Sequence, residues 1–135
     1  ITNSFRNISY IPGGRWINNI WVHDKFIWQY AVNNDVLLKK VIINFLTPYG
    51  LDTLNFNGLT AQLNKLIITT SSTSTESILD SQTSPQSIDT SNCRCIRINL
   101  PQPINLFKGE IIELMISSYR LEPSYDPKFE GEILY

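Results

Sequence analysis

The sequence predicts an all-β protein, an antiparallel two-sheet β-sandwich with jelly-roll topology that occupies residues 1–135 as a single domain. Short apolar stretches rich in β-branched and aromatic residues recur along the chain, and Gly, Pro and Asn separate them at short intervals. No stretch shows the sustained 3.6-residue periodicity of a long amphipathic helix. A chain of 135 residues is the size of one domain, so a second independent core does not fit.

The first strands are expected in the N-terminal third. Ile1–Ile11 alternates imperfectly between apolar and polar residues, and Pro12–Gly14 has the composition of a turn. Two aromatic-rich groups follow, Arg15–Val22 and Phe26–Tyr30. Each group favours a strand because aromatic and β-branched side chains pack well on a pleated sheet.

The middle of the chain combines one clear strand with an ambiguous segment. Val36–Leu46 is expected to be a long strand because of its β-branched cluster and the Pro48–Gly50 stop that follows. Leu51–Leu63 fits neither period, so a loop with a short helix remains open there. Leu63–Thr70 alternates again and predicts another strand.

Two polar tracts follow, Thr69–Thr75 and Ser81–Asn92, and both consist mainly of Ser, Thr and other uncharged polar residues. Only Ile78–Leu79 between them has the character of a buried segment. We therefore expect a long surface connection that holds one short strand.

The C-terminal third predicts three strands with clearer boundaries. Cys93–Leu100 alternates as a strand with one buried face and is expected to end at Pro101–Pro103. Ile111–Tyr119 follows a turn at Lys108–Glu110, and Phe129–Tyr135 closes the sequence.

Two of these segments carry a family resemblance. Leu106–Leu114, Leu-Phe-Lys-Gly-Glu-Ile-Ile-Glu-Leu, resembles the "Leu, x, Lys, Gly, Asp, x, Val, x, Leu" stretch of C1q and tumour-necrosis-factor-like jelly rolls. Phe129–Tyr135 is similar to the "Phe, x, Gly, x, Leu, Leu, Tyr" strand that ends those domains. The resemblance implies a compact jelly roll, often a homotrimer, that serves recognition or display, as in viral fibre tips and capsid decorations.

The first half departs from that family. Its "Gly, x, Tyr, x, Phe" strand is missing, and the nearest stretch is Asp24–Tyr30. This stretch also resembles the "Asp, x, Phe" opening of some carbohydrate-binding sandwiches.

The charge balance narrows the classes of partner. Eleven Lys and Arg against twelve Asp and Glu leave a net charge of −1, so no overall field would draw the protein to nucleic acid. Only 17% of residues are charged, and uncharged Asn, Ser, Thr and Gln take the place of the Lys and Glu that most proteins carry. This composition favours a β-rich module of a virion or an extracellular surface. No apolar run approaches the roughly 20 residues that span a bilayer, so no membrane insertion is expected.

The sequence offers no constellation for catalysis or metal binding. His23 is the single imidazole, and Asp24 beside it would point to the opposite face of a strand. Cys93 and Cys95 are expected to be free thiols, with a bridge between subunits as the alternative. Two carboxylates from distant strands could converge to support glycoside hydrolysis, but the sequence does not indicate which of the twelve acidic residues would form such a pair. We therefore expect no catalytic residue, no metal, no cofactor and no enzymatic activity.

Aromatic residues are the best candidates for ligand contact, because exposed rings stack on sugars or anchor protein interfaces. We expect at least two of the three tryptophans, Trp16, Trp21 and Trp28, to be structural. The candidate ligand-binding residues are those of the expected loops together with one strand tryptophan: Tyr49, Tyr119, Tyr125, Asp126 and Trp28.

These observations support three functional hypotheses. The first is a self-assembling subunit, preferably a homotrimer, or a partner of other structural proteins in a particle. The second is a carbohydrate-binding module that uses loop aromatics. The third is a filament subunit whose Ile1–Ile11 segment adds to a neighbour's sheet.

Overall fold

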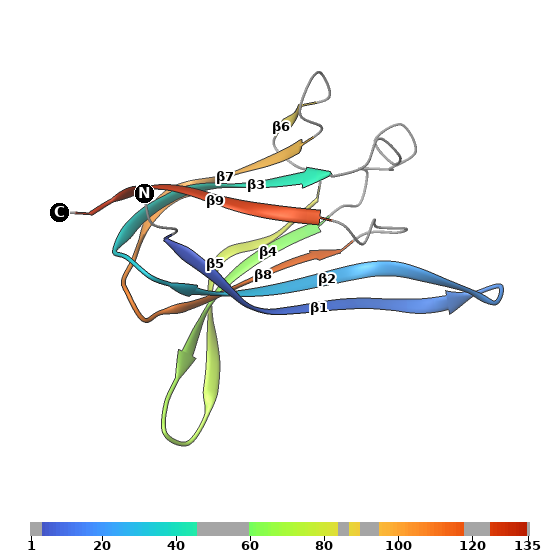
Figure 1. The fold of residues 1–135 in the computed structure, drawn as a ribbon, viewed down its shortest axis with the longest axis horizontal. Coiled ribbons are helices and arrows are strands. Elements are labelled where there is room, and N and C mark those ends of the chain that lie inside the picture. Colours follow the sequence, from blue (N-terminus) through green and yellow to red (C-terminus); the bar gives the residue numbers. More distant parts are fainter. Residues whose placement is uncertain (1–3, 46–59, 84–86, 90–94, 118–124, 135) are drawn as a thin grey trace.

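The protein folds into two facing antiparallel β-sheets (Figure 1). The structure is a computed structural model, and it describes residues 4–45, 60–83, 87–89, 95–117 and 125–134. One sheet has the strand order β1-β2-β8-β4-β5 and the other has β6-β7-β3-β9. The described residues include no helix. The predicted all-β, two-sheet sandwich class is therefore confirmed.

The strands of the described ranges have the following bounds: β1 Phe5–Ile17, β2 Ile20–Val32, β3 Val36–Phe45, β4 Thr60–Ile68, β5 Thr73–Thr83, β6 Ser87–Asp89, β7 Cys95–Leu106, β8 Ile111–Ser117 and β9 Tyr125–Ile133. Among these residues, none belongs to a helix long and apolar enough to cross a membrane.

The strands pair as a nested series. β4 pairs with β5 at the centre of the series, β3 pairs with β7 around it, and β2 pairs with β8 outside both. Successive pairs alternate between the two sheets, so the folded-back chain wraps around a shared interior. β9 adds to the remaining side of β3 and ends its sheet.

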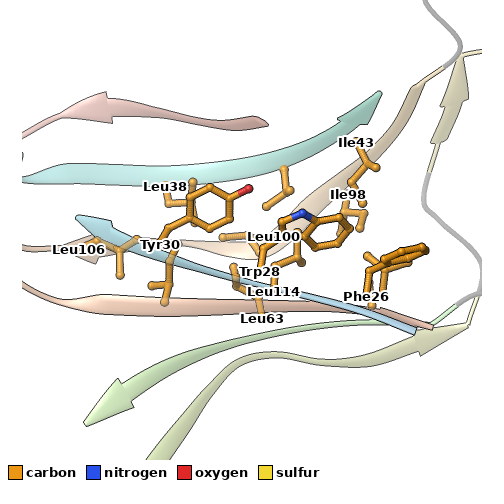
Figure 2. Packing of buried hydrophobic residues seen from close by; sticks show 14 of the residues in the cluster. Phe26, Trp28, Tyr30, Leu38, Ile43, Leu63, Ile98, Leu100, Leu106 and Leu114 are labelled. Atoms are coloured by element: carbon orange, nitrogen blue, oxygen red, sulfur yellow. The ribbon is translucent and has the colours of Figure 1, made fainter. Parts of the chain in front are cut away.

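The hydrophobic core lies between the sheets and takes buried residues from β2, β3, β4, β7, β8 and β9; Figure 2 shows part of it. Alternate residues of β8 are buried, and Leu114 at its centre has no exposed surface. Burying one such side chain contributes about 2 kcal/mol to folding. The core residues labelled in Figure 2 are Phe26, Trp28, Tyr30, Leu38, Ile43, Leu63, Ile98, Leu100, Leu106 and Leu114.

Two predicted strand ends are wrong, because both proline-containing segments continue as strand. β1 passes through Pro12–Gly14, and Pro12 still pairs in register with Phe26 of β2. β1 is an edge strand, and sheets tolerate proline mainly in edge strands because one side of such a strand makes no ladder bonds. β7 passes through Pro101–Pro103 at a register shift between Leu38 and Lys40 of β3. Residues 100–103 have no register partner in β3, so these prolines break no pair.

The Ser/Thr tracts likewise form more strand than the sequence predicts. β5 covers residues that were expected to be a connection, and it pairs along β4 at the edge of the sheet. Thr favours strands through its branched Cβ, and an edge strand can leave its polar side chains in water. β4 begins at Thr60, within the segment that the sequence left open between loop and short helix; residues 46–59 lie outside the described ranges.

Other expectations are confirmed. β3 covers the predicted strand at Val36–Leu46 up to Phe45. The turn before β8 places Gly109 at a φ of 94°, a left-handed conformation that glycine adopts without steric cost. One expectation here is wrong: β9 begins at Tyr125, four residues before the predicted start at Phe129, so Tyr125 and Asp126 lie in a strand and not in a loop.

Candidate functional site: an aromatic groove and a projecting arm

A groove of about 610 Å³ opens between β9 of one sheet and β1 and β2 of the other. This size falls within the usual range of ligand pockets. Most of the lining side chains are aromatic, and the polar ones are an amide, a carboxylate and an ammonium group. The groove is lined by Phe5, Asn7, Tyr10, Trp28, Tyr30, Tyr125, Asp126, Pro127, Lys128 and Phe129.

One wall of the groove is the outer edge of β9. Five consecutive residues, 125–129, line it. Successive side chains of a strand point to opposite faces, so a groove that meets all five lies along the edge of the strand. β3 pairs with the other side of β9, and no described strand pairs with this edge. The groove therefore borders the outer edge of β9, which has no neighbouring strand in the described sheet.

The opposite wall consists of rings from the β1–β2 pair. Tyr10 lies across from Trp28 in the register and stacks on it, with ring centroids 5.5 Å apart. At the other end of the groove, Phe5 and Tyr30 approach Phe129 at centroid distances of 4.8 and 4.7 Å. These contacts hold β9 against the second sheet and leave aromatic surface facing the groove.

The polar groups of the groove fix its charge. Asp126 and Lys128 are exposed at the rim, so the groove itself has no net charge. Burial raises the pKa of Tyr30 far above its ordinary value; a hydrogen bond with Asn7 opposes this rise and the charge of Asp126 adds to it. Burial also raises the pKa of Tyr10. Both phenols are therefore neutral at pH 7 and can donate hydrogen bonds.

Three of the five predicted ligand-binding residues, Trp28, Tyr125 and Asp126, come together in this groove. Trp28 is only 4% exposed, so it supplies part of the floor, whereas Asp126 lies at the open rim. Tyr49 and Tyr119 lie outside the described residues.

Sequence reasoning missed most of the remaining lining. Phe5, Asn7 and Tyr10 enter the groove because β1 pairs with β2, and the sequence alone does not specify that pairing. Pro127 and Lys128 follow Tyr125 and Asp126 directly, so an expectation of a strand starting at Tyr125 would have found them.

A second surface feature is the outer part of the β1–β2 hairpin, which projects beyond the sandwich (Figure 1). We call residues 13–24 the arm. β2 pairs with β8 only from Lys25 onward, so within the described residues the arm is a two-stranded ribbon. Its turn is Asn18–Asn19, and both residues have positive φ, as a type I′ hairpin turn requires.

Large apolar side chains are exposed on the arm. Trp16 is 71% exposed, and Ile20 and Trp21 are also exposed. Trp16 packs edge-on against Trp21, and a chain of ring contacts continues through His23 to buried Phe26. The expectation that at least two tryptophans are structural is therefore wrong, because only Trp28 is buried. The sequence could not show that β2 extends beyond the strands that cover it.

His23 lies in this ring series and was expected to be a surface or turn residue. The structure instead places it half-buried in β2, between Trp21 and Phe26, with Nδ1 buried and without a hydrogen-bond partner among the described residues. Asp24 pairs with Arg15 at 3.3 Å. Within the described part of the chain, no three His, Cys, Asp or Glu residues gather as metal ligands would. Cys93 lies outside the described residues, as does the side chain of Cys95.

No family model, curated protein or solved structure matches this chain.

Proposed function

We propose that this protein is a non-enzymatic structural or recognition module, a self-assembling jelly-roll subunit displayed on a virion, fibre or cell surface. The observation that carries the proposal is the arm, which exposes Trp16, Ile20 and Trp21 beyond the sandwich. Contiguous exposed apolar surface of this kind marks protein interaction sites. Trp is also among the residues that most often dominate binding energy in interfaces.

The arm has a physical reason to be covered in the assembled protein. An isolated two-stranded ribbon is only marginally stable in water. Contact with another protein would remove its large side chains from water, at about 25 cal/mol for each Å² of apolar surface buried. The arm and its partner would therefore stabilise each other.

The nested pairing supports the jelly-roll part of the proposal. A jelly roll forms when antiparallel pairs nest within one another and wrap so that successive pairs lie in opposite sheets, as β4–β5, β3–β7 and β2–β8 do. The two resembling segments support it as well: the glycine turn at Gly109 leads into β8, and Phe129 lies in β9. The homotrimer within the proposal rests on that resemblance.

The test is the solution mass of the purified chain by light scattering, at tens of micromolar, with and without reductant. A stable trimer is the expected result. A monomer with no tendency to associate would contradict self-assembly. A larger species that dissociates in reductant would mean that a disulfide bond of Cys93 or Cys95 joins the copies.

Carbohydrate binding is the second candidate function, and the groove favours it. Trp28, Tyr125 and Asp126 line one cavity that combines aromatic surface with a carboxylate, the chemistry that packs on a sugar face and bonds its hydroxyls. A glycan array probed with multivalent protein tests it, because single sites are weak. Binding that Asp126→Asn weakens is expected, whereas no signal on a broad array argues against the candidate.

A further inference from the structure

We propose that copies of this chain assemble by placing the arm of one copy into the aromatic groove of the next. The inference rests on the self-assembly proposed above. It adds the two surfaces that meet and the direction of the contact between them.

The shape of the groove favours an extended polypeptide as its occupant. The β9 wall is a strand edge, and none of the described strands pairs with it. Free backbone N–H and C=O groups along an edge accept an added strand, which supplies their hydrogen bonds. Pro127 has no N–H donor, so an added strand would bond there to the carbonyl of this residue. A sugar would satisfy such a row less completely than a strand would.

The arm has the properties that this occupant needs. It is extended, and among the described residues β8 pairs with Lys25–Ala31 of β2 and not with residues 20–24. This outer edge of β2 can pair with β9, while Trp16 and Trp21 bring rings to the aromatic wall at Tyr10. Offset and edge-on ring pairs stabilise a contact beyond the effect of the area that they bury.

Charge presents no obstacle to this contact. The arm carries Arg15 and Asp24, which pair with each other, and the groove rim carries Asp126 and Lys128. Both surfaces are thus neutral, and no like charges need to be brought together in a desolvated contact.

The arm of a chain cannot fill the groove of the same chain. Tyr10 lines the groove and Trp16 lies six residues further along the same strand, which is about 20 Å at 3.3 Å per residue. The ribbon continues from there to its turn at Asn18–Asn19, and Figure 1 shows the hairpin of β1 and β2 extending past the end of β9. A second copy is therefore required.

The contact is heterologous, because the arm and the groove are different surfaces. Each copy donates one arm and accepts one, so the assembly closes into a ring if the rotation allows it and otherwise grows as a filament. A three-membered ring agrees with the homotrimer proposed above.

Two variants test the pairing. Trp16→Ser with Trp21→Ser removes the rings of the arm, and both positions are exposed, so the fold should persist. Tyr10→Arg with Lys128→Glu changes the groove at two exposed positions. Each variant alone is expected to lose the oligomer, with at least a tenfold weaker association by light scattering.

Mixing the two monomeric variants is the decisive measurement. The groove variant retains an intact arm and the arm variant retains an intact groove, so the mixture should form a one-to-one dimer. Failure of the mixture to associate would overturn the inference.

The hairpin tip between β4 and β5 offers a matched control. Ile67 and Ile68 are exposed there, and Ile67→Ser with Ile68→Ser should leave the mass unchanged. Loss of the oligomer in this control as well would show a non-specific effect of apolar surface and would overturn the inference.

The outcomes separate the two proposals. A wild-type monomer contradicts self-assembly itself. A wild-type oligomer that survives both the arm and the groove variants preserves self-assembly and overturns the arm-to-groove contact. Circular dichroism checks that each variant folds; if Tyr10→Arg does not, Asp126→Arg beside the unchanged Lys128 replaces it, because two positive charges would then have to be desolvated when the arm binds, with the same expected loss of association.

Discussion

Trp16 lies directly across the hairpin from Trp21, with the two indoles edge-on and their ring centroids 5.4 Å apart. This pair is the outer end of a ring series that begins in the core at Phe26. The same face of the sheet is thus buried at one end and open to solvent at the other. The face of the β1–β2 pair that packs in the core extends into the arm, where no described strand of the second sheet covers it.

Two neighbouring glycines should respond differently to alanine at the base of the arm. A Cβ on Gly14 would lie 2.5 Å from the Val22 carbonyl oxygen and 2.8 Å from the Trp21 ring, whereas a Cβ on Gly13 would meet nothing closer than 3.4 Å. We expect Gly14→Ala to weaken the ribbon by about 1–3 kcal/mol through overpacking. Amide hydrogen exchange of the arm measures this effect. Equal exchange in Gly13→Ala and Gly14→Ala would contradict the prediction.

Gly131 should be intolerant of any side chain. A Cβ at this position would lie 2.9 Å from the carbonyl carbon of Leu37 and 3.0 Å from Cα of Leu38, both of which are backbone atoms that cannot rotate away. We expect Gly131→Ala to lower the free energy of unfolding by about 2–4 kcal/mol in urea titrations. Glu130→Ala next to it removes an exposed ion pair with Lys40 and should cost less than about 1 kcal/mol. Similar losses in the two variants would show that the close backbone approach is unimportant.

The central strand β8 should be the most sensitive to cavity formation. Leu114 is fully buried, and Leu114→Ala is expected to destabilise the protein by about 2–5 kcal/mol. Ile68, 61% exposed at the end of β4, provides the control, and Ile68→Ala should change stability by less than about 0.5 kcal/mol. Urea unfolding followed by circular dichroism measures both. A small effect at Leu114 would mean that the two sheets do not pack tightly there.

Tyr30 should make the fold sensitive to alkali. Burial raises the pKa of Tyr30 in the folded state, so the folded protein retains a proton that the unfolded chain loses near pH 10. The stabilisation is complete below that pH and decreases as the pH rises, with a slope of about 1 kcal/mol per unit. Unfolding free energies at pH 9 and pH 11 test this prediction.

The control for this titration is Tyr30→Phe, which keeps the ring and removes the ionising group. Its stability should fall less steeply over the same pH interval. An identical slope in the variant and the wild type would assign the alkaline loss to other groups.

The sequence predicted the fold class because alternation is a local property. The period-2 pattern of β8 and the turn at Gly109 both depend on neighbouring residues alone. Pro12 and Pro101 were misleading because their effect depends on the strand pairing: Pro12 lies in an edge strand, and Pro101 lies where β7 has no register partner in β3. Only the three-dimensional pairing shows which positions those are.

The candidate site was predictable in part for the same reason. Trp28, Tyr125 and Asp126 were selected for their chemistry, and the fold brings them into one groove. The contribution of Phe5 and Tyr10 depends on how β1 aligns with β2, and the exposure of Trp16 depends on where β8 ends. The first is set by the register of a hairpin, and the second by a strand that lies far along the chain.

The nested pairing has a consequence for how fast the protein folds. Gln29 donates a hydrogen bond to Glu113 across β2 and β8, although the two residues are 84 positions apart. Such distant contacts give a high contact order, and chains of this kind fold in milliseconds to seconds. During synthesis, β2 and β3 leave the ribosome long before β8, β7 and β9 can pair with them. The apolar side chains of the early strands therefore stay exposed until the later strands have been synthesised. Slower synthesis would prolong the interval in which the nascent chain can aggregate.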